Sequence, residues 1–304
     1  MHIANGTVNQ AREWVAPVAL SLAALFWSGN FIAGRALRDD IDPVMLNALR
    51  WVLACMLFLP FAGPACLAHS AAIRRHWRWL LALGATGIAA FHTVVYVALS
   101  QTTATNALLV LALAPVAILL GSALIGASRP TALQWAGSVV SLFGAAVLIT
   151  RADIEMLRDL AVNKGDLWML AAVVIWAAYA LLLRRRPTDL SPMVTLAASM
   201  GLGAMLMLPV AVLTLHTGYL SVSPSVLGAL AYVVVFPSVL AFWFWGYGVA
   251  RMGPERAGQF IHLMPVFGPV LAMAILGERI EPAQLAGAVV IFAGIALVIR
   301  RTAD

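Results

Sequence analysis

Polar and aromatic side chains occur in pairs, three or four residues apart, inside long hydrophobic stretches of this sequence. Residues at that spacing share one face of a helix. Because hydrogen-bonding groups in lipid are costly unless they face other helices or water, we expect these faces to converge on one amphipathic cavity, where rings stack on an apolar substrate. The alternative is hydrogen bonding between helices without a ligand. The predicted substrate-binding residues are Trp27 and Asn30, His92 and Tyr96, Trp176 and Tyr179, and Gln259 and His262.

Residues that catalyse reactions or hold metals are missing from the same stretches. No Asp or Glu lies at the centre of any of them, and the sequence has neither an HExxH motif nor a phosphate-binding GxxxxGK[ST] loop. We therefore predict no catalytic residue, no metal, no cofactor and no transport driven by ATP hydrolysis in this chain. The missing carboxylate argues against a buried proton relay, so downhill efflux is the simpler prediction. His92 and His262 keep proton coupling open, because histidine titrates near neutral pH.

Arg50 is the most isolated charge in the sequence, about seven residues inside the second hydrophobic stretch. At 1.5 Å per helical residue this is roughly 10 Å from the outer end of that stretch. Its long side chain can extend back to the membrane surface, where Asp42 or Asp40 would pair with it. This structural interpretation is the one that we favour. The alternative is that Arg50 meets a substrate carboxylate.

The elements that position these residues are membrane-spanning helices. Hydrophobic residues make up 62% of the chain and charged residues 11%, far from the values of soluble domains. About 20 apolar residues cross a bilayer as a helix, which satisfies its own backbone groups. We predict an all-α polytopic membrane protein with ten transmembrane helices. The ten windows are 16–34, 43–63, 77–98, 104–124, 131–149, 165–183, 192–214, 226–249, 256–276 and 283–299.

The second half of the sequence repeats the first at a shift of about 150 residues. Pro115 and Gly144, for example, recur as Pro265 and Gly294. Each half holds five predicted spans, and because five is odd the two copies enter the membrane in opposite directions. Such inverted repeats place the substrate between the halves and favour alternating access. The predicted domains are a first repeat at 1–149, a periplasmic connector at 150–164 and a second repeat at 165–304.

Prolines and glycines within the spans predict bends and close helix contacts. We predict hinges at Pro115, Pro265 and Pro237, because proline removes a helical hydrogen bond; a static kink is the alternative. Small residues such as Gly144 and Gly294 let helices approach closely in lipid, which predicts a scaffold contact. Most other aromatic residues near span ends are expected to anchor the chain at the membrane interface. These are Trp77, Trp79, Trp168, Trp243, Trp245 and Tyr247, of which Trp168 and Trp243 are also candidates for a vestibule or cavity.

The net charge of +6 is distributed as expected for membrane topology rather than for nucleic-acid binding. Twelve Lys and Arg residues fall in the termini and in the loops after the even-numbered spans, and six fall in the other connections. Cytoplasmic segments carry such an excess. We therefore predict that both termini are cytoplasmic in a bacterial inner membrane. The expected partners are a small-molecule substrate and the lipid bilayer, without nucleic acid; the oligomeric state stays open and a monomer is compatible with the sequence.

A motif near the end of each half resembles the closing motif of the EamA repeat, found in ten-helix exporters of the drug/metabolite transporter superfamily. In the second half it reads Ile275-Leu276-Gly277-Glu278-Arg279, followed by Gln284, Gly287 and Gly294. The first half has Ser128 in place of Glu278 but keeps Arg129, Gln134, Gly137 and Gly144. The stretch Trp27 to Phe31 is similar to the first-helix signature of that family. The resemblance covers nearly the whole chain.

The resemblance implies export of small metabolites, commonly amino acids and their relatives, through a cavity between the halves. In general character the chain is most similar to exporters of aromatic amino acids. We therefore predict a secondary transporter or facilitator for neutral aromatic or large apolar amino acids, working by alternating access. The alternatives are export of nucleosides or lipophilic cations and, more remotely, an intramembrane lipid-modifying enzyme.

Overall fold

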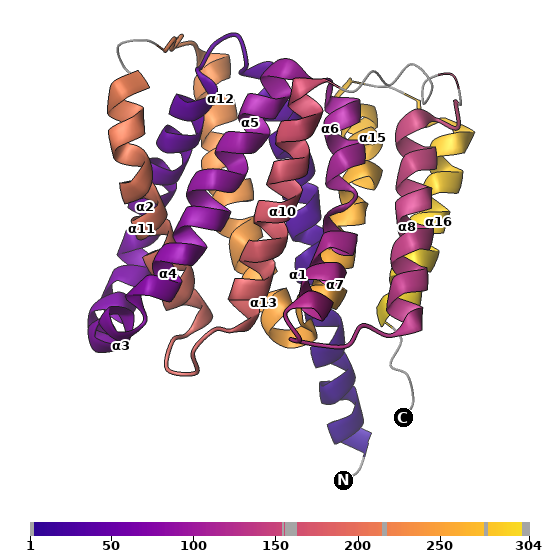
Figure 1. Cartoon of the computed structure of the whole chain (residues 1–304), viewed down its shortest axis with the longest axis horizontal. Helices are drawn as coiled ribbons and strands as arrows, with labels where there is room; N and C mark the ends of the chain where they lie inside the picture. Colours follow the sequence, from indigo (N-terminus) through magenta and orange to yellow (C-terminus); the bar gives the residue numbers. More distant parts are fainter. Residues whose placement is uncertain (1–2, 154, 156–162, 215–217, 277–278, 300–304) are drawn as a thin grey trace.

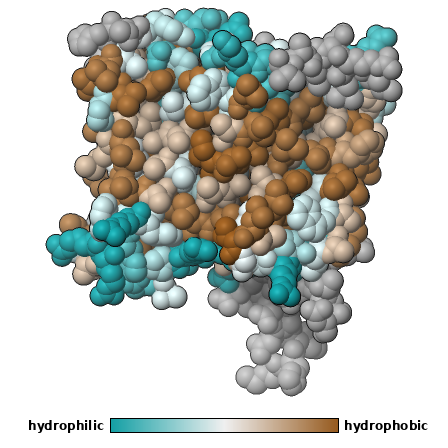
Figure 2. Space-filling view, in the orientation of Figure 1, coloured by the Kyte–Doolittle hydropathy of each residue, from teal (hydrophilic) through white to brown (hydrophobic). Residues whose placement is uncertain are grey.

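The fold is a bundle of long helices standing side by side, seen in a computed structural model (Figure 1). The structure describes residues 3–153, 155, 163–214, 218–276 and 279–299. Most of the predicted connector, and the motif residues Gly277 and Glu278, lie outside these ranges. Figure 2 shows a broad hydrophobic band across the visible face of the bundle, with hydrophilic residues at both ends. An apolar belt between polar ends is the surface expected of a membrane-embedded protein.

Nine of the ten predicted windows, all except 256–276, overlap helical stretches that qualify as membrane spans among the described residues. Within the described residues, nine helical stretches are long and apolar enough to cross a membrane, and none forms a strand beyond one isolated bridge between Ile41 and Leu220. The window predicted at 256–276 contains an interrupted helix built from α14, η3 and α15. The helices are α1 Ile3–Ala36, α2 Pro43–Ala68, α3 Ser70–Arg75, α4 Trp77–Leu83, α5 Phe91–Gln101, α6 Ala104–Leu111, α7 Ala114–Leu124, α8 Ala132–Thr150, α10 Lys164–Arg184, α11 Pro192–Thr214, α12 Pro224–Val233, α13 Ala241–Met252, α14 Pro254–Gly258, α15 Leu263–Leu276 and α16 Pro282–Ile299.

A π-helical turn interrupts the third and the eighth span. The two turns, η1 (Gly84–Ala90) and η2 (Val234–Leu240), are separated by the repeat distance seen in the sequence. Pro237 lies inside η2, and its carbonyl oxygen accepts a hydrogen bond from the indole N–H of Trp27 at 3.1 Å. Turns of this kind free backbone groups and are frequent at functional sites. The proline predicted as a hinge in the eighth span therefore contacts the first helix directly.

The predicted fourth and ninth spans are interrupted at equivalent positions. The helix breaks at Ala112 and Leu113 between α6 and α7, and Pro115 is the second residue of α7. In the second half, the 3₁₀ turn η3 (Gln259–His262) joins α14 to α15, in which Pro265 is the third residue. Proline has no backbone N–H to donate and therefore fits the first turn of a helix. Both prolines predicted as hinges lie directly after an interruption.

Glycines join α8 to α16 along what we call the glycine seam (Gly137, Gly144, Gly287 and Gly294). A Cβ atom built on Gly137 would lie 2.6 Å from the carbonyl oxygen of Gly294, and one on Gly144 would lie 2.9 Å from that of Gly287. The residue order shows that the two helices run antiparallel. Because only glycine leaves room for backbones this close, the seam fixes the spacing of the two helices.

Candidate functional site

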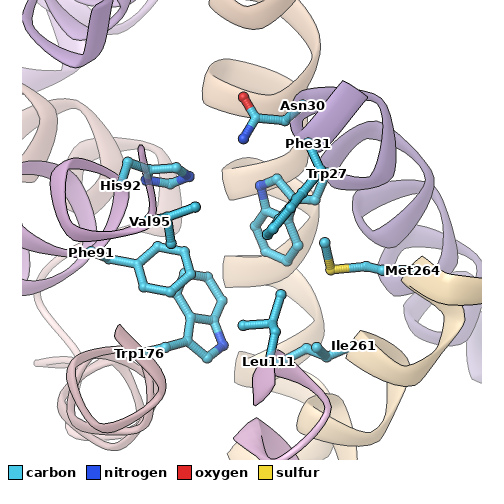
Figure 3. Close-up of a pocket in the computed structure, with 10 residues that line it drawn as sticks. All are labelled: Trp27, Asn30, Phe31, Phe91, His92, Val95, Leu111, Trp176, Ile261 and Met264. Atoms are coloured by element: carbon cyan, nitrogen blue, oxygen red, sulfur yellow. The ribbon is translucent and has the colours of Figure 1, made fainter. Parts of the chain in front are cut away.

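A small cavity lies between helices of both halves of the chain (Figure 3). Four of the eight predicted substrate-binding residues line it, and all four are buried. Its volume of about 20 Å³ is little more than one water molecule requires, so the walls are closed together in this structure. The lining residues are Trp27, Asn30 and Phe31 of α1, Phe91, His92 and Val95 of α5, Leu111 of α6, Trp176 of α10, Ile261 of η3 and Met264 of α15.

The cavity is largely apolar, with two polar residues at one end. Asn30 and His92 lie at one end, whereas Leu111 and Ile261 lie at the other, with aromatic rings between them (Figure 3). This arrangement suits a ligand that has one polar end and one apolar end.

Aromatic rings form the walls of the cavity. The Trp27 and Trp176 rings meet edge to face with centroids 5.1 Å apart, and Phe91 lies 4.7 Å from Trp176. Behind them, Trp245 packs against both tryptophans at 5.6 and 5.1 Å, and Phe242 lies 5.7 Å from Trp27. Such contacts add stability beyond area burial and hold each ring in a fixed orientation. The cluster forms rigid apolar walls for a planar or branched side chain.

The prediction that Trp245 anchors the chain at the membrane interface is wrong. Only 1% of this residue is exposed, whereas 40% of Trp243 is exposed. Phe242, Trp245 and Val249 follow one another at spacings of three and four residues and form the inner face of α13. This helical spacing is the sequence signal for the inward position of Trp245 and Phe242. The aromatic residues near the end of the same span favour an interfacial position instead, so the two signals conflict.

A hydrogen-bond network adjoins the polar end of the cavity. The Asn30 Oδ1 atom accepts from the Tyr96 hydroxyl at 2.9 Å and from Arg50 Nη1 at 3.2 Å. Arg50 also donates to Tyr96 at 2.9 Å and to the Ser238 hydroxyl, and its guanidinium lies 5.0 Å from the Trp51 ring centroid. The two residues of the predicted pair, His92 and Tyr96, therefore have different positions. His92 lines the cavity, and Tyr96 supports Asn30 from behind.

Arg50 is fully buried, contrary to the expectation that its side chain reaches the surface and pairs with Asp42 or Asp40. Asp42 instead caps α2, because its Oδ1 accepts from the backbone N–H groups of Val44 and Met45. Within the described part of the chain, no carboxylate forms an ion pair with Arg50. The sequence alone could not reveal this, because the partners of Arg50 lie on α1, α5 and η2.

The other predicted residues lie next to the cavity rather than on its surface. The Tyr179 ring packs 5.2 Å from Trp176 but lines a neighbouring hollow with Phe242 and Trp243. His262 donates its Nε2–H to the carbonyl oxygen of Ala112 at 2.7 Å. This bond gives the carbonyl group a partner at the point where the fourth span is interrupted. Gln259 donates to the carbonyl oxygen of Glu255 at 3.3 Å. In this conformation, therefore, His262 and Gln259 donate hydrogen bonds to backbone carbonyl oxygens at or next to the helix interruptions.

A polar cluster joins the two halves at the end where α10 begins. Asp166 accepts from the Thr102 hydroxyl at 2.6 Å and from the Asn106 amide at 3.4 Å. Thr102 and Asn106 belong to the first half and Asp166 to the second. The cluster therefore holds the halves together on one side of the cavity.

A second polar cluster joins the halves at the opposite end, where α10 finishes. Glu255 Oε1 accepts from the hydroxyls of Ser122 and Ser128 at 2.5 and 2.6 Å and pairs with Arg184 at 2.5 Å. Burial alone would raise the Glu255 pKa, but the two serine hydroxyls and the Arg184 charge outweigh it and lower the pKa below its ordinary value. Contacts between the two halves therefore lie near both ends of α10.

The Glu255→Gln variant should unfold more easily than the wild type. It removes the charge that pairs with Arg184, whose side chain is partly exposed, so we expect a loss on the order of 1–2 kcal/mol. Because the folded pKa is lowered, the ionised carboxylate stabilises the wild type above the ordinary carboxyl pKa, and this contribution disappears as pH falls through the lowered value. Thermal unfolding in detergent from pH 7 to pH 3 should therefore show the two proteins converging in acid. A constant difference across that range would contradict the assignment.

The chain was compared with protein-family models, curated proteins and solved structures. A model described as the EamA-like transporter family matches residues 14–150 and 163–300. The chain is 31% identical to an uncharacterized transporter, YyaM, of Bacillus subtilis (strain 168), over 71% of this chain and 70% of that protein. It is 28% identical to a probable terminal-alkyne amino-acid exporter of Streptantibioticus cattleyicolor, over 93% of each. A crystal structure with 24% identity shares the fold, with a TM-score of 0.74 over 95% of this chain and 99% of the other.

Proposed function

We propose that this chain, which belongs to the EamA-like transporter family, exports neutral amino acids with aromatic or large apolar side chains. The observation that carries the proposal is the amphipathic cavity, to which both halves contribute rings and one end of which is polar. A relative named as a probable terminal-alkyne amino-acid exporter supports an amino-acid substrate. Aromatic walls favour apolar side chains over charged ones.

The architecture that we propose is ten spans in two inverted repeats, 1–149 and 165–304, joined by a periplasmic connector at 150–164. The antiparallel glycine seam supports it, because α8 and α16 occupy equivalent places in the two repeats. We place both termini in the cytoplasm of a bacterial cell. In support, the start of α1 and the end of α16 lie on the same side of the bundle as the basic helix α3 (Figure 1), and basic residues mark the cytoplasmic side.

The mechanism that we propose is alternating access without a metal or a covalent intermediate. One polar cluster opens while the other stays closed, so that the cavity faces each side of the membrane in turn. The clusters around Asp166 and Glu255 are suited to this role because each joins residues of both halves. Pro115, Pro237 and Pro265 lie at helix interruptions, where backbone angles can change with the loss of few hydrogen bonds.

The proposal is tested by efflux from proteoliposomes that contain the full chain and labelled solute. Phenylalanine, tryptophan and leucine should leave faster than from empty liposomes, whereas glutamate and lysine should not. Nucleosides and a lipophilic cation are measured in parallel. Efflux of these solutes without efflux of any amino acid would contradict the proposed substrate. In a separate incubation of the purified protein with labelled lipid, the appearance of modified lipid would instead indicate an enzyme.

A further inference from the structure

Arg50 holds a positive charge inside the bundle that no carboxylate of the described chain neutralises. Arginine keeps its proton in proteins, so this charge persists. The hydrogen-bond partners of Arg50 are neutral, namely the Asn30 amide and the hydroxyls of Tyr96 and Ser238. Its Nη2 atom is buried and has no hydrogen-bond partner among the described residues. A buried charge without an opposite charge is costly, so its retention requires a reason.

Arg50 adjoins the cavity already described through its contact with Asn30. Asn30 lines the cavity and accepts from Arg50 through the oxygen of its amide group. The indole N–H of Trp176 also lacks an acceptor among the described residues, but it lies toward the Leu111 end of the cavity, away from Asn30 (Figure 3). No residue that lines the cavity carries a carboxylate. Next to Asn30 the structure therefore offers an unpaired guanidinium donor and a positive charge, which together favour an anionic acceptor.

A carboxylate matches these donors in charge and in geometry. The planar guanidinium donates two parallel hydrogen bonds to the two oxygens of a carboxylate, and such charge-assisted bonds are the strong ones. The Asn30 oxygen occupies one donor of Arg50 in the closed structure. A ligand oxygen can take its place when the walls part, without leaving any donor unpaired.

We propose that Arg50 binds the carboxylate of the transported substrate, and that the substrates are monocarboxylates whose remaining part is aromatic or large and apolar. This inference rests on the proposed function and narrows its substrate class. The carboxylate lies at the Arg50 and Asn30 end, and the apolar part lies between Trp27, Phe91 and Trp176. A lipophilic cation is repelled at the same position.

Binding to the detergent-purified full chain tests the inference with two matched pairs of ligands. Phenylalanine is compared with phenylalaninamide, and 3-phenylpropanoate with the uncharged 3-phenylpropanamide. The wild type should bind each carboxylate at least tenfold more tightly than its amide. Arg50→Gln should lose this preference, and Arg50→Lys should keep part of it because it retains the charge without the planar fork. Trp176→Phe, which removes the N–H donor and part of the ring, should reduce the preference less.

The outcomes separate this inference from the proposed function. Equal affinity of the wild type for carboxylate and amide overturns the role of Arg50, even if phenylalanine is exported. This comparison requires no variant, so it decides the question even where Arg50→Gln does not fold. Preference for 3-phenylpropanoate over its amide, without transport of any amino acid, supports the role of Arg50 and contradicts amino-acid export. If no member of either pair binds, both the role of Arg50 and the proposed substrate class are overturned.

Discussion

The Trp176→Ala variant is expected to lose more than nine-tenths of the transport activity. The Trp176 ring is 2% exposed and packs against Trp27, Phe91, Tyr179 and Trp245. Truncation removes one wall of the cavity and lets the neighbouring rings turn, which costs about 3–5 kcal/mol in well-packed cores. The measurement is the initial rate of efflux from proteoliposomes, using the amino acid that the wild type moves fastest.

Trp168→Ala is the matched control, because Trp168 lies on the same helix and is 45% exposed. It should retain nearly the wild-type rate. Trp176→Phe should fall between the two, since it keeps an aromatic ring but fills less of the wall. Wild-type efflux by Trp176→Ala, or an equal loss in Trp168→Ala, would show that the cavity is not on the transport path.

The second large effect is expected at the glycine seam, where Gly294→Val should prevent stable folding. A Cβ atom at position 294 would lie 2.5 Å from the backbone nitrogen of Ser141 and 2.6 Å from the carbonyl oxygen of Gly137. These contacts are with backbone, so neither helix can relieve them by moving a side chain. Separating α8 from α16 should cost about 3 kcal/mol or more. The measurements are the yield of monodisperse protein in detergent and its unfolding temperature.

Gly228→Val supplies the control for this experiment. Gly228 lies within α12, and a Cβ atom there would meet nothing within 4 Å. Its yield and unfolding temperature should stay close to those of the wild type. Equal behaviour of the two variants would mean that valine in a helix, rather than the close contact between α8 and α16, determines the result.

Half of the predicted binding residues line the cavity because helical spacing selects them. Trp27, Asn30, His92 and Trp176 are rare polar or ring-bearing residues on apolar helices, and the cost of exposing polar groups to lipid turns such faces inward. The same reasoning brings Tyr179, Gln259 and His262 into the interior but not to the cavity surface. An inward face is wider than a binding site, so spacing alone does not separate lining residues from supporting ones.

The sequence by itself determined the helices, because a helix in lipid satisfies its own backbone hydrogen bonds and needs only a local run of apolar residues. It also determined the repeat and the family, because both are read from residues that recur at fixed spacings. Tertiary structure decided the partners of Arg50 and the contact of His262 with the carbonyl oxygen of Ala112. Each of these depends on the rotation of one helix about its axis relative to another. Contacts between residues far apart in the chain, such as that of the Trp27 indole with the Pro237 carbonyl, set that rotation. No local pattern encodes it.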